Sequence, residues 1–233
     1  MIFKDKDGFL ANETLDLADS CFRCGIATVF KLPEKYMNIF HYIDPILTPR
    51  RHPTQIPANN PKNFSKDQLI PLMAALYLKD DTFYSRQIFW KLFFRGFFCF
   101  NTERDWPGST KNPWPEKMVS KDPNDNGKWR YFDAPDPLFL SPHVLWFLAR
   151  CSRLYFVELL LAPIGILWLF LNVRFQSKNT SHENNQILVI TKIMGQLWVD
   201  LYKKHNPKWK MQVRNYWYSR NEHDYATCII ENY

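Results

Sequence analysis

The chain has 233 residues, 46% of them hydrophobic and 17% aromatic, so it can bury one ordinary core and is too apolar to be a disordered polymer. Its net charge of +7 is scattered, without a basic run or a nucleic-acid-binding signature, so nucleic acid is an unfavoured partner. The odd number of five cysteines argues against a disulfide framework and favours a reducing compartment.

The N-terminal residues lack the basic start, apolar stretch and cleavage site of a signal peptide, so we expect a cytoplasmic protein. The region from Thr14 to Leu32 carries apolar residues at helical spacing and predicts the first helix. Asp19 and Arg23 lie one turn apart on it. An exposed ion pair and a polar site that faces a cavity are both compatible with this spacing.

Cys21 and Cys24 form a Cys-x-x-Cys motif on the same helix. The chain has no second such motif and no histidine pair at zinc-finger spacing. Packing is therefore the favoured interpretation, ahead of a metal or redox site.

A proline-rich passage from Asp44 to Asn63 then breaks regular structure. Within it, Arg50, Arg51 and His52 bring two guanidinium groups and an imidazole together. These groups suit a carboxylate, a phosphate or sugar hydroxyls, although a basic cluster in a loop is also commonly just solvated.

The segment from Ser65 to Gln68 has the spacing of a capping box and predicts a helix that starts at Ser65. Asp67, in the first turn of that helix, could simply complement the helix dipole. If Asp67 converges with Asp19, one carboxylate could act as an acid and the other as a base, with the arginines separating their pKa values.

A second helix is expected from about Thr82 to Phe100. Between residues 101 and 142, prolines and glycines interrupt every period and predict a long irregular excursion. Four oxygen ligands within it follow the spacing of an EF-hand calcium loop: Asp122, Asn124, Asn126 and Asp133. Because the flanks are rich in proline, a surface loop of Asx turns is favoured, and calcium is the one cofactor that the sequence suggests.

From His143 to Arg174 the sequence predicts a strongly apolar helix, in which residues 154–173 hold a single charge, Glu158. That length could cross a bilayer. Glu158, Pro163 and the chain's mean hydropathy of −0.37 favour a buried central helix, with a membrane span and a helix docked on a membrane as alternatives. We expect an amphipathic helix from Gln186 to Lys204 and short helices thereafter.

The chain resembles an uncharacterised family of bacterial and phage hypothetical proteins. Four stretches carry this resemblance: Asp19-x-x-x-Arg23-x-Gly25, Arg51-His52-Pro53, Asn63-Phe64-Ser65-Lys66-Asp67-Gln68, and the ending Trp217-Tyr218 through Ile229-Ile230-Glu231. In that family a glycine usually precedes the aspartate and an arginine usually stands at the Lys66 position, so Ala18 and Lys66 depart from the pattern. The resemblance implies no activity. The placement of polar residues at helix starts is also weakly similar to that in helical-toroid carbohydrate enzymes, and this likeness concerns the fold alone.

We therefore predict one all-α domain over residues 1–233 with six to nine helices, which the toroid likeness would arrange as helical hairpins. One hypothesis is a ligand-binding or hydrolytic cleft for a polar or saccharide substrate. Asp19 and Asp67 would be its catalytic residues, and its substrate-binding residues would be Arg23, Arg50, Arg51, His52 and Gln68. The alternative is a non-enzymatic structural or membrane-associated protein that contacts a partner or a bilayer through residues 154–173.

Overall fold

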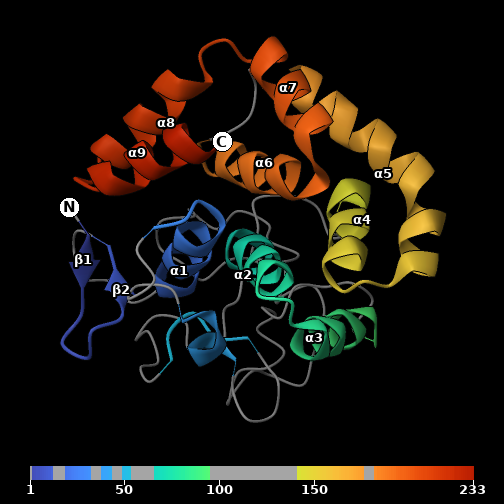
Figure 1. Cartoon of the computed structure of the whole chain (residues 1–233), viewed down its shortest axis with the longest axis horizontal. Coiled ribbons are helices and arrows are strands. Elements are labelled where there is room, and N and C mark those ends of the chain that lie inside the picture. The colour runs from blue at the N-terminus through green and yellow to red at the C-terminus, as the bar shows by residue number, and fades with distance from the viewer. Residues whose placement is uncertain are drawn as a thin grey trace, which may run out of the picture.

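The computed structural model describes residues 2–12, 19–32, 38–43, 49–53, 66–94, 141–175 and 181–233. Over these ranges the chain forms nine α-helices, one 3-10 helix and a two-stranded sheet, which confirms the all-α prediction (Figure 1). The arrangement does not show a toroid. The elements are β1 (Phe3–Lys4), β2 (Leu10–Ala11), α1 (Ser20–Val29), η3 (Ile39–Tyr42), α2 (Lys66–Leu78), α3 (Thr82–Phe94), α4 (Pro142–Cys151), α5 (Tyr155–Phe175), α6 (Ser181–Met194), α7 (Gln196–His205), α8 (Trp209–Tyr218) and α9 (His223–Asn232).

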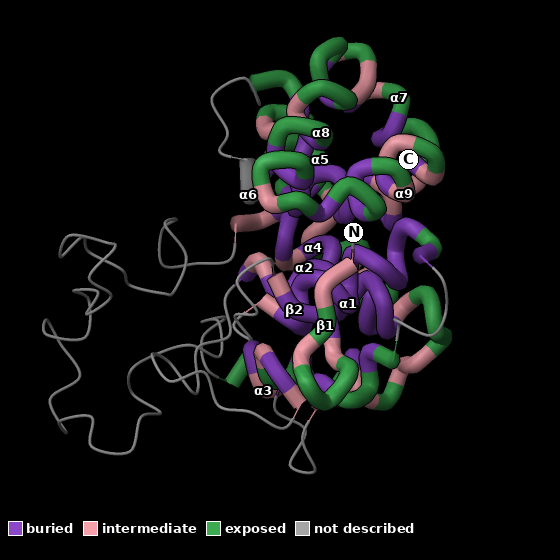
Figure 2. Tube along the Cα trace, turned by 90° about the vertical axis from the view of Figure 1, so that its left-hand side faces the viewer, coloured by how far each residue is buried: buried purple, intermediate pink, exposed green. Residues whose placement is uncertain are grey.

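The centre of the core is the pair of helices α1 and α2, which are buried along most of their length (Figure 2). Gly25 permits their close contact, because a Cβ there would lie 2.4 Å from Cβ of Pro71 and 2.7 Å from its carbonyl carbon. Pro71 stands inside α2 and the helix continues through it. The sequence thus combines a glycine in one helix with a proline in the other to bring the two backbones together.

The C-terminal half covers this pair. Helix α6 packs on α2, α4 and α8, and α8 and α9 form a hairpin that reaches α1. Helix α5 lies on the outer edge, against α4 and α7 (Figure 1).

Several helix limits differ from the prediction. The stretch from His143 to Arg174 is two helices, because the chain turns after α4 at Arg153, whose φ is 50°. The predicted helix from Gln186 to Lys204 is divided at Gly195, whose φ of 113° is a conformation that glycine tolerates best. Helix α3 is described to Phe94, and the residues up to Phe100 lie outside the described part.

The prediction that residues 154–173 form a buried helix is wrong. Helix α5 buries only Gly165, Leu169 and Val173, which follow one another at four-residue intervals and so form one narrow stripe. Only 17% of its most apolar window is buried. The mean hydropathy of a whole chain does not predict the environment of a single helix, and here it predicted the wrong one.

Candidate functional site

The first backbone amides of helix α1 donate hydrogen bonds to residues from distant segments of the chain. The amide of Cys21 donates to the carbonyl oxygen of Arg51 at 2.8 Å, and the amide of Phe22 donates to Oε1 of Gln68 at 2.7 Å. Asp19 stands at the N-cap position, but its side chain makes no capping hydrogen bond. The first turn of α1 is thus fixed by α2 and by the loop at residues 49–53, and the three predicted motifs meet there.

Asp19 is the point on which these segments converge. Its Oδ1 accepts a hydrogen bond from Nε2 of Gln68 at 3.1 Å and lies 3.8 Å from Nη1 of Arg51. Its Oδ2 lies 3.5 Å from Nη1 of Arg23. The Asp19 side chain is 37% exposed, so this carboxylate is held by three partners and remains accessible to solvent. We name Asp19, Arg23, Arg51, Gln68 and Glu222 the polar centre.

Arg23 is locked inside the protein. Its Nε and Nη2 donate to the two carboxylate oxygens of Glu222 at 2.5 and 2.8 Å, and both side chains are almost fully buried. Burial opposes the charge on Arg23, but the hydrogen bond that Arg23 donates to Glu222 and the carboxylate of Asp19 outweigh it, so the pKa of Arg23 is raised. Arg23 is therefore charged, and its guanidinium group holds Glu222 in position and faces Asp19.

Phe22 stacks on Trp217 with ring centroids 5.7 Å apart, and Trp217 stacks on Tyr225 at 4.7 Å. These parallel rings join α1 to the hairpin of α8 and α9. Together with the ion pair of Arg23 and Glu222, they fix the polar centre against the C-terminal helices.

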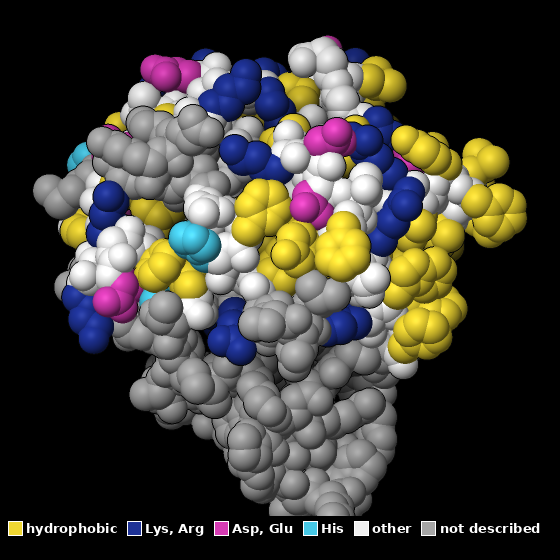
Figure 3. Space-filling model, turned by 60° about the horizontal axis from the view of Figure 1, so that its bottom comes forward, with side chains coloured by type: hydrophobic (Ala, Val, Ile, Leu, Met, Phe, Trp, Pro, Cys, Tyr) yellow, Lys and Arg dark blue, Asp and Glu magenta, His cyan; other side chains and the backbone are white. Residues whose placement is uncertain are grey.

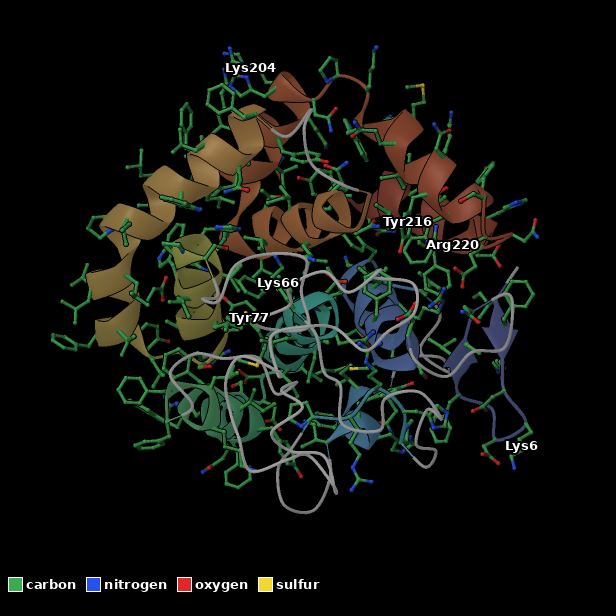
Figure 4. The ribbon with its side chains drawn as sticks, turned by 180° about the vertical axis from the view of Figure 1, so that it is seen from behind. Lys6, Lys66, Tyr77, Lys204, Tyr216 and Arg220 are labelled. Carbon is green, nitrogen blue, oxygen red and sulfur yellow. The ribbon has the colours of Figure 1, made fainter. Side chains whose placement is uncertain are left out.

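Asp67 belongs to the same region. Its Oδ1 accepts a hydrogen bond from Nε2 of Gln186, which ties the start of α2 to α6. The side chain of Tyr216, on α8, is buried. Burial raises the pKa of Tyr216, Arg220 and Arg23 lower it, and the carboxylates of Asp19 and Asp67 raise it further. Tyr216 lies on the C-terminal helices, beside Arg220 (Figure 4).

The loop residues take separate positions. Nε2 of His52 lies 2.6 Å from Oδ2 of Asp5, and the His52 side chain is fully buried. The other oxygen of Asp5 accepts hydrogen bonds from the amides of Asp7 and Phe9, so Asp5 ties His52 to the β1–β2 turn. Arg50 is exposed, and its amide donates to the carbonyl oxygen of Tyr42 at 2.7 Å.

The predicted calcium residues, Asp122, Asn124, Asn126 and Asp133, lie outside the described residues, as does the irregular excursion up to residue 140. Within the described part of the chain, no group of three or more histidine, cysteine, aspartate or glutamate residues could hold a metal ion. Cys21 and Cys24 are both buried in α1, and burial raises the pKa of Cys24 to about 12.

Sequence reasoning missed three residues of this region: Glu222, Gln186 and Tyr216. Each lies more than a hundred residues from its partner in α1 or α2, and none belongs to a motif that the sequence analysis used for the site. Comparison with family models, with curated proteins and with solved structures finds no match for this chain.

Proposed function

We propose that the chain is a membrane-surface protein whose helix α5 lies in the lipid–water interface. The observation that carries this proposal is the exposure of α5. Eleven of its large apolar side chains are exposed: Tyr155, Phe156, Leu159, Leu160, Ile164, Ile166, Leu167, Trp168, Phe170, Leu171 and Phe175. Hydrophobic side chains gather in Figure 3 along the edge where α5 lies in Figure 1. Soluble monomers rarely expose a continuous apolar patch of more than a few hundred Å².

The length and composition of α5 suit a lipid environment. It has 21 residues and a hydropathy of 2.1 over its most apolar window, and it is the one described helix that is long and apolar enough to cross a membrane. The two common explanations for such a helix do not apply here, because α5 is neither buried as a core helix nor near the N-terminus.

The packing of α5 favours a position along the membrane surface. One stripe of α5 packs on α4 and α7, and α7 carries the exposed charges of Asp200 and Lys204. If α5 crossed the bilayer with its neighbours attached, these charges would enter the hydrocarbon at a cost of about 2.5–3.5 kcal/mol each or more. A helix that lies in the interface avoids this cost.

The charges around α5 also suit an anionic lipid surface. Oε1 of Glu158, the one acidic residue of α5, accepts a hydrogen bond from Nη1 of Arg150 at 2.8 Å, which neutralises it. Arg153, before the helix, forms an ion pair with Asp80, and Arg174 lies exposed in the last turn of the helix. A basic side chain near an anionic membrane contributes about 1 kcal/mol.

Vesicle flotation of the purified chain tests the proposal. We expect it to float with vesicles of phosphatidylcholine and phosphatidylglycerol, and less with phosphatidylcholine alone. Leu167→Glu should weaken partitioning at least tenfold, because a buried leucine contributes about 1.5–3 kcal/mol. The control is Met211→Glu, at an exposed apolar residue of α8, which should float like the parent chain.

Three results would overturn the proposal. The parent chain could stay with the soluble fraction, Leu167→Glu could bind as well as the parent chain, or protease added outside sealed vesicles could leave one end of the chain protected. The last result would show that α5 spans the bilayer.

The paired-carboxylate cleft stays a prediction and is the second candidate function. The observation that favours it is that the Asp19 carboxylate is 37% exposed and accepts a hydrogen bond from Gln68, the residue that follows Asp67. In a screen of glycans for binding or hydrolysis, Asp67→Asn should abolish any activity found and leave the chain folded. A folded Asp67→Asn variant with unchanged activity would contradict this reading.

A further inference from the structure

A pocket of about 290 Å³ lies between α6, α7 and α8. Its volume is at the lower end of the range for small-molecule sites, about 300–1,000 Å³, so the pocket suits a small ligand. The described residues that line it are Asn184, Asn185, Leu188, Tyr202, Gln212, Val213, Asn215, Tyr216, Ser219 and Arg220. Among these described residues, Arg220 alone is charged, and none belongs to the predicted cleft.

The lining has a buried apolar side and a polar side that solvent reaches. Leu188, Tyr202 and Val213 are buried, and they come from three different helices. Ser219 is exposed and Arg220 is half-buried, just after the end of α8. A ligand therefore meets the charge of the pocket near solvent and its apolar side chains at greater depth.

The guanidinium group of Arg220 is held in position by Tyr216. Its Nη1 donates to the carbonyl oxygen of Tyr216 at 3.1 Å, and its central carbon lies 4.1 Å from the centre of the Tyr216 ring. Figure 4 shows the two residues next to each other on the C-terminal helices. Within the part of the chain that the structure describes, no carboxylate pairs with Arg220. Since a guanidinium has further N–H donors, Arg220 can bind an acceptor that enters the pocket.

Two carboxylates act on the wall of the pocket from outside it. Burial and, after it, the charges of Asp19 and Asp67 raise the pKa of Tyr216, whereas Arg220 lowers it. Asp19 lies beside Arg51, and Asp67 accepts a hydrogen bond from α6. Each of these carboxylates thus has a partner other than Arg220, and the described lining itself carries a positive charge.

We infer that this pocket binds the carboxylate of a small organic acid that has an apolar body. The planar fork of a guanidinium matches the two oxygens of a carboxylate. One positive charge balances a monoanion, whereas a phosphate monoester carries about 1.5–2 negative charges at neutral pH. Leu188 and Val213 supply the surface on which the apolar body packs. This inference goes beyond the membrane proposal and does not depend on it, since it uses no residue of α5.

The test is a calorimetric titration of the purified full chain with benzoate and hexanoate. Benzamide has the shape of benzoate without its charge, acetate lacks the apolar body, and phenyl phosphate replaces the carboxylate. We expect saturable binding of benzoate or hexanoate at millimolar concentration or below. Benzamide and acetate should each bind at least tenfold more weakly, because each lacks one of the two groups that the pocket recognises.

Two variants of Arg220 test its role. Arg220→Gln removes the charge and should weaken binding of the carboxylate at least tenfold, because hydrogen bonds between charged groups are the stronger ones. Arg220→Lys keeps the charge and should also weaken binding, because an ammonium group lacks the planar fork. The control is Arg214→Gln, at an exposed arginine of α8 outside the lining, which should bind like the parent chain. Urea unfolding of each variant shows whether it is folded.

Each of four results would overturn the inference. Neither carboxylate binds at tens of millimolar, benzamide binds as tightly as benzoate, phenyl phosphate alone binds, or a folded Arg220 variant binds no more weakly than Arg214→Gln. Because flotation on vesicles is measured separately, failure of this inference is distinguishable from failure of the membrane proposal.

Discussion

Acidification should destabilise the protein through His143, the second residue of α4. His143 is buried, and its Nδ1 has no hydrogen-bond partner among the described residues. Burial and the positive charge of Lys66 lower the pKa of His143 from 6.5 to about 3. Since the unfolded chain binds a proton below about pH 6.5 and the native chain does not, the free energy of unfolding falls as the pH drops below that value and is unaffected above it.

The size of this effect follows from the two pKa values. Between about pH 7 and about pH 5, a shift of the pKa from 6.5 to about 3 removes about 2 kcal/mol from the free energy of unfolding. The loss should continue until the pH approaches the native pKa. Above about pH 7 the group contributes almost nothing to the pH dependence.

Urea unfolding of the parent chain and of His143→Gln, at about pH 7 and about pH 5, measures the contribution of His143 to the free energy of unfolding. Glutamine cannot be protonated, so the variant should lose about 2 kcal/mol less than the parent chain between the two pH values. The cost of the substitution itself cancels in this comparison. If detergent is added, it is the same in all four samples. Equal losses in the two proteins would refute the reasoning.

Three further predictions concern packing and charge. Gly25→Ala should lower the free energy of unfolding by about 2 kcal/mol or more in urea, because the new Cβ meets the backbone of Pro71; a neutral or stabilising effect, as for an ordinary helical glycine, would contradict the contact. Glu222→Gln removes the buried carboxylate that pairs with Arg23 and should cost about 3–5 kcal/mol in the same assay, whereas a loss below about 1 kcal/mol would show that the pair is dispensable. Mass spectrometry after brief treatment with a thiol reagent should find Cys228, which is half-buried, modified before the other three described cysteines, which are buried, and the reverse order would contradict the packing.

The sequence predicted helices wherever apolar residues repeated at helical spacing, and it missed the turns that end them. At Arg153 and Asn221 the chain adopts a left-handed conformation, with φ of 50° and 55°, although neither residue is a glycine. Such turns depend on the packing of the helices on either side. Asparagine adopts this conformation more readily than most residues do. The residue type of Arg153 does not mark a turn, so the stretch from 143 to 174 was predicted as one helix.

The site was predictable only in part. The motifs around Asp19, Arg51 and Gln68 stood out as polar islands, and their contacts join them in the structure. Glu222, which holds Arg23, lies 199 residues further along the chain. Pairing over such a distance depends on the fold as a whole, and a single sequence carries no periodicity that could indicate it.

The ion pair of Arg23 and Glu222 also constrains the order in which the chain can fold. Helix α1 is synthesised before α9, yet the carboxylate that pairs with its buried arginine belongs to the residue just before α9. Closing a contact across 199 residues costs loop entropy that short-range contacts avoid. Until α8 and α9 have been synthesised, burial of Arg23 would remove it from water without the hydrogen bonds to Glu222. Helix α1 should therefore reach its native position only after α9 has been made.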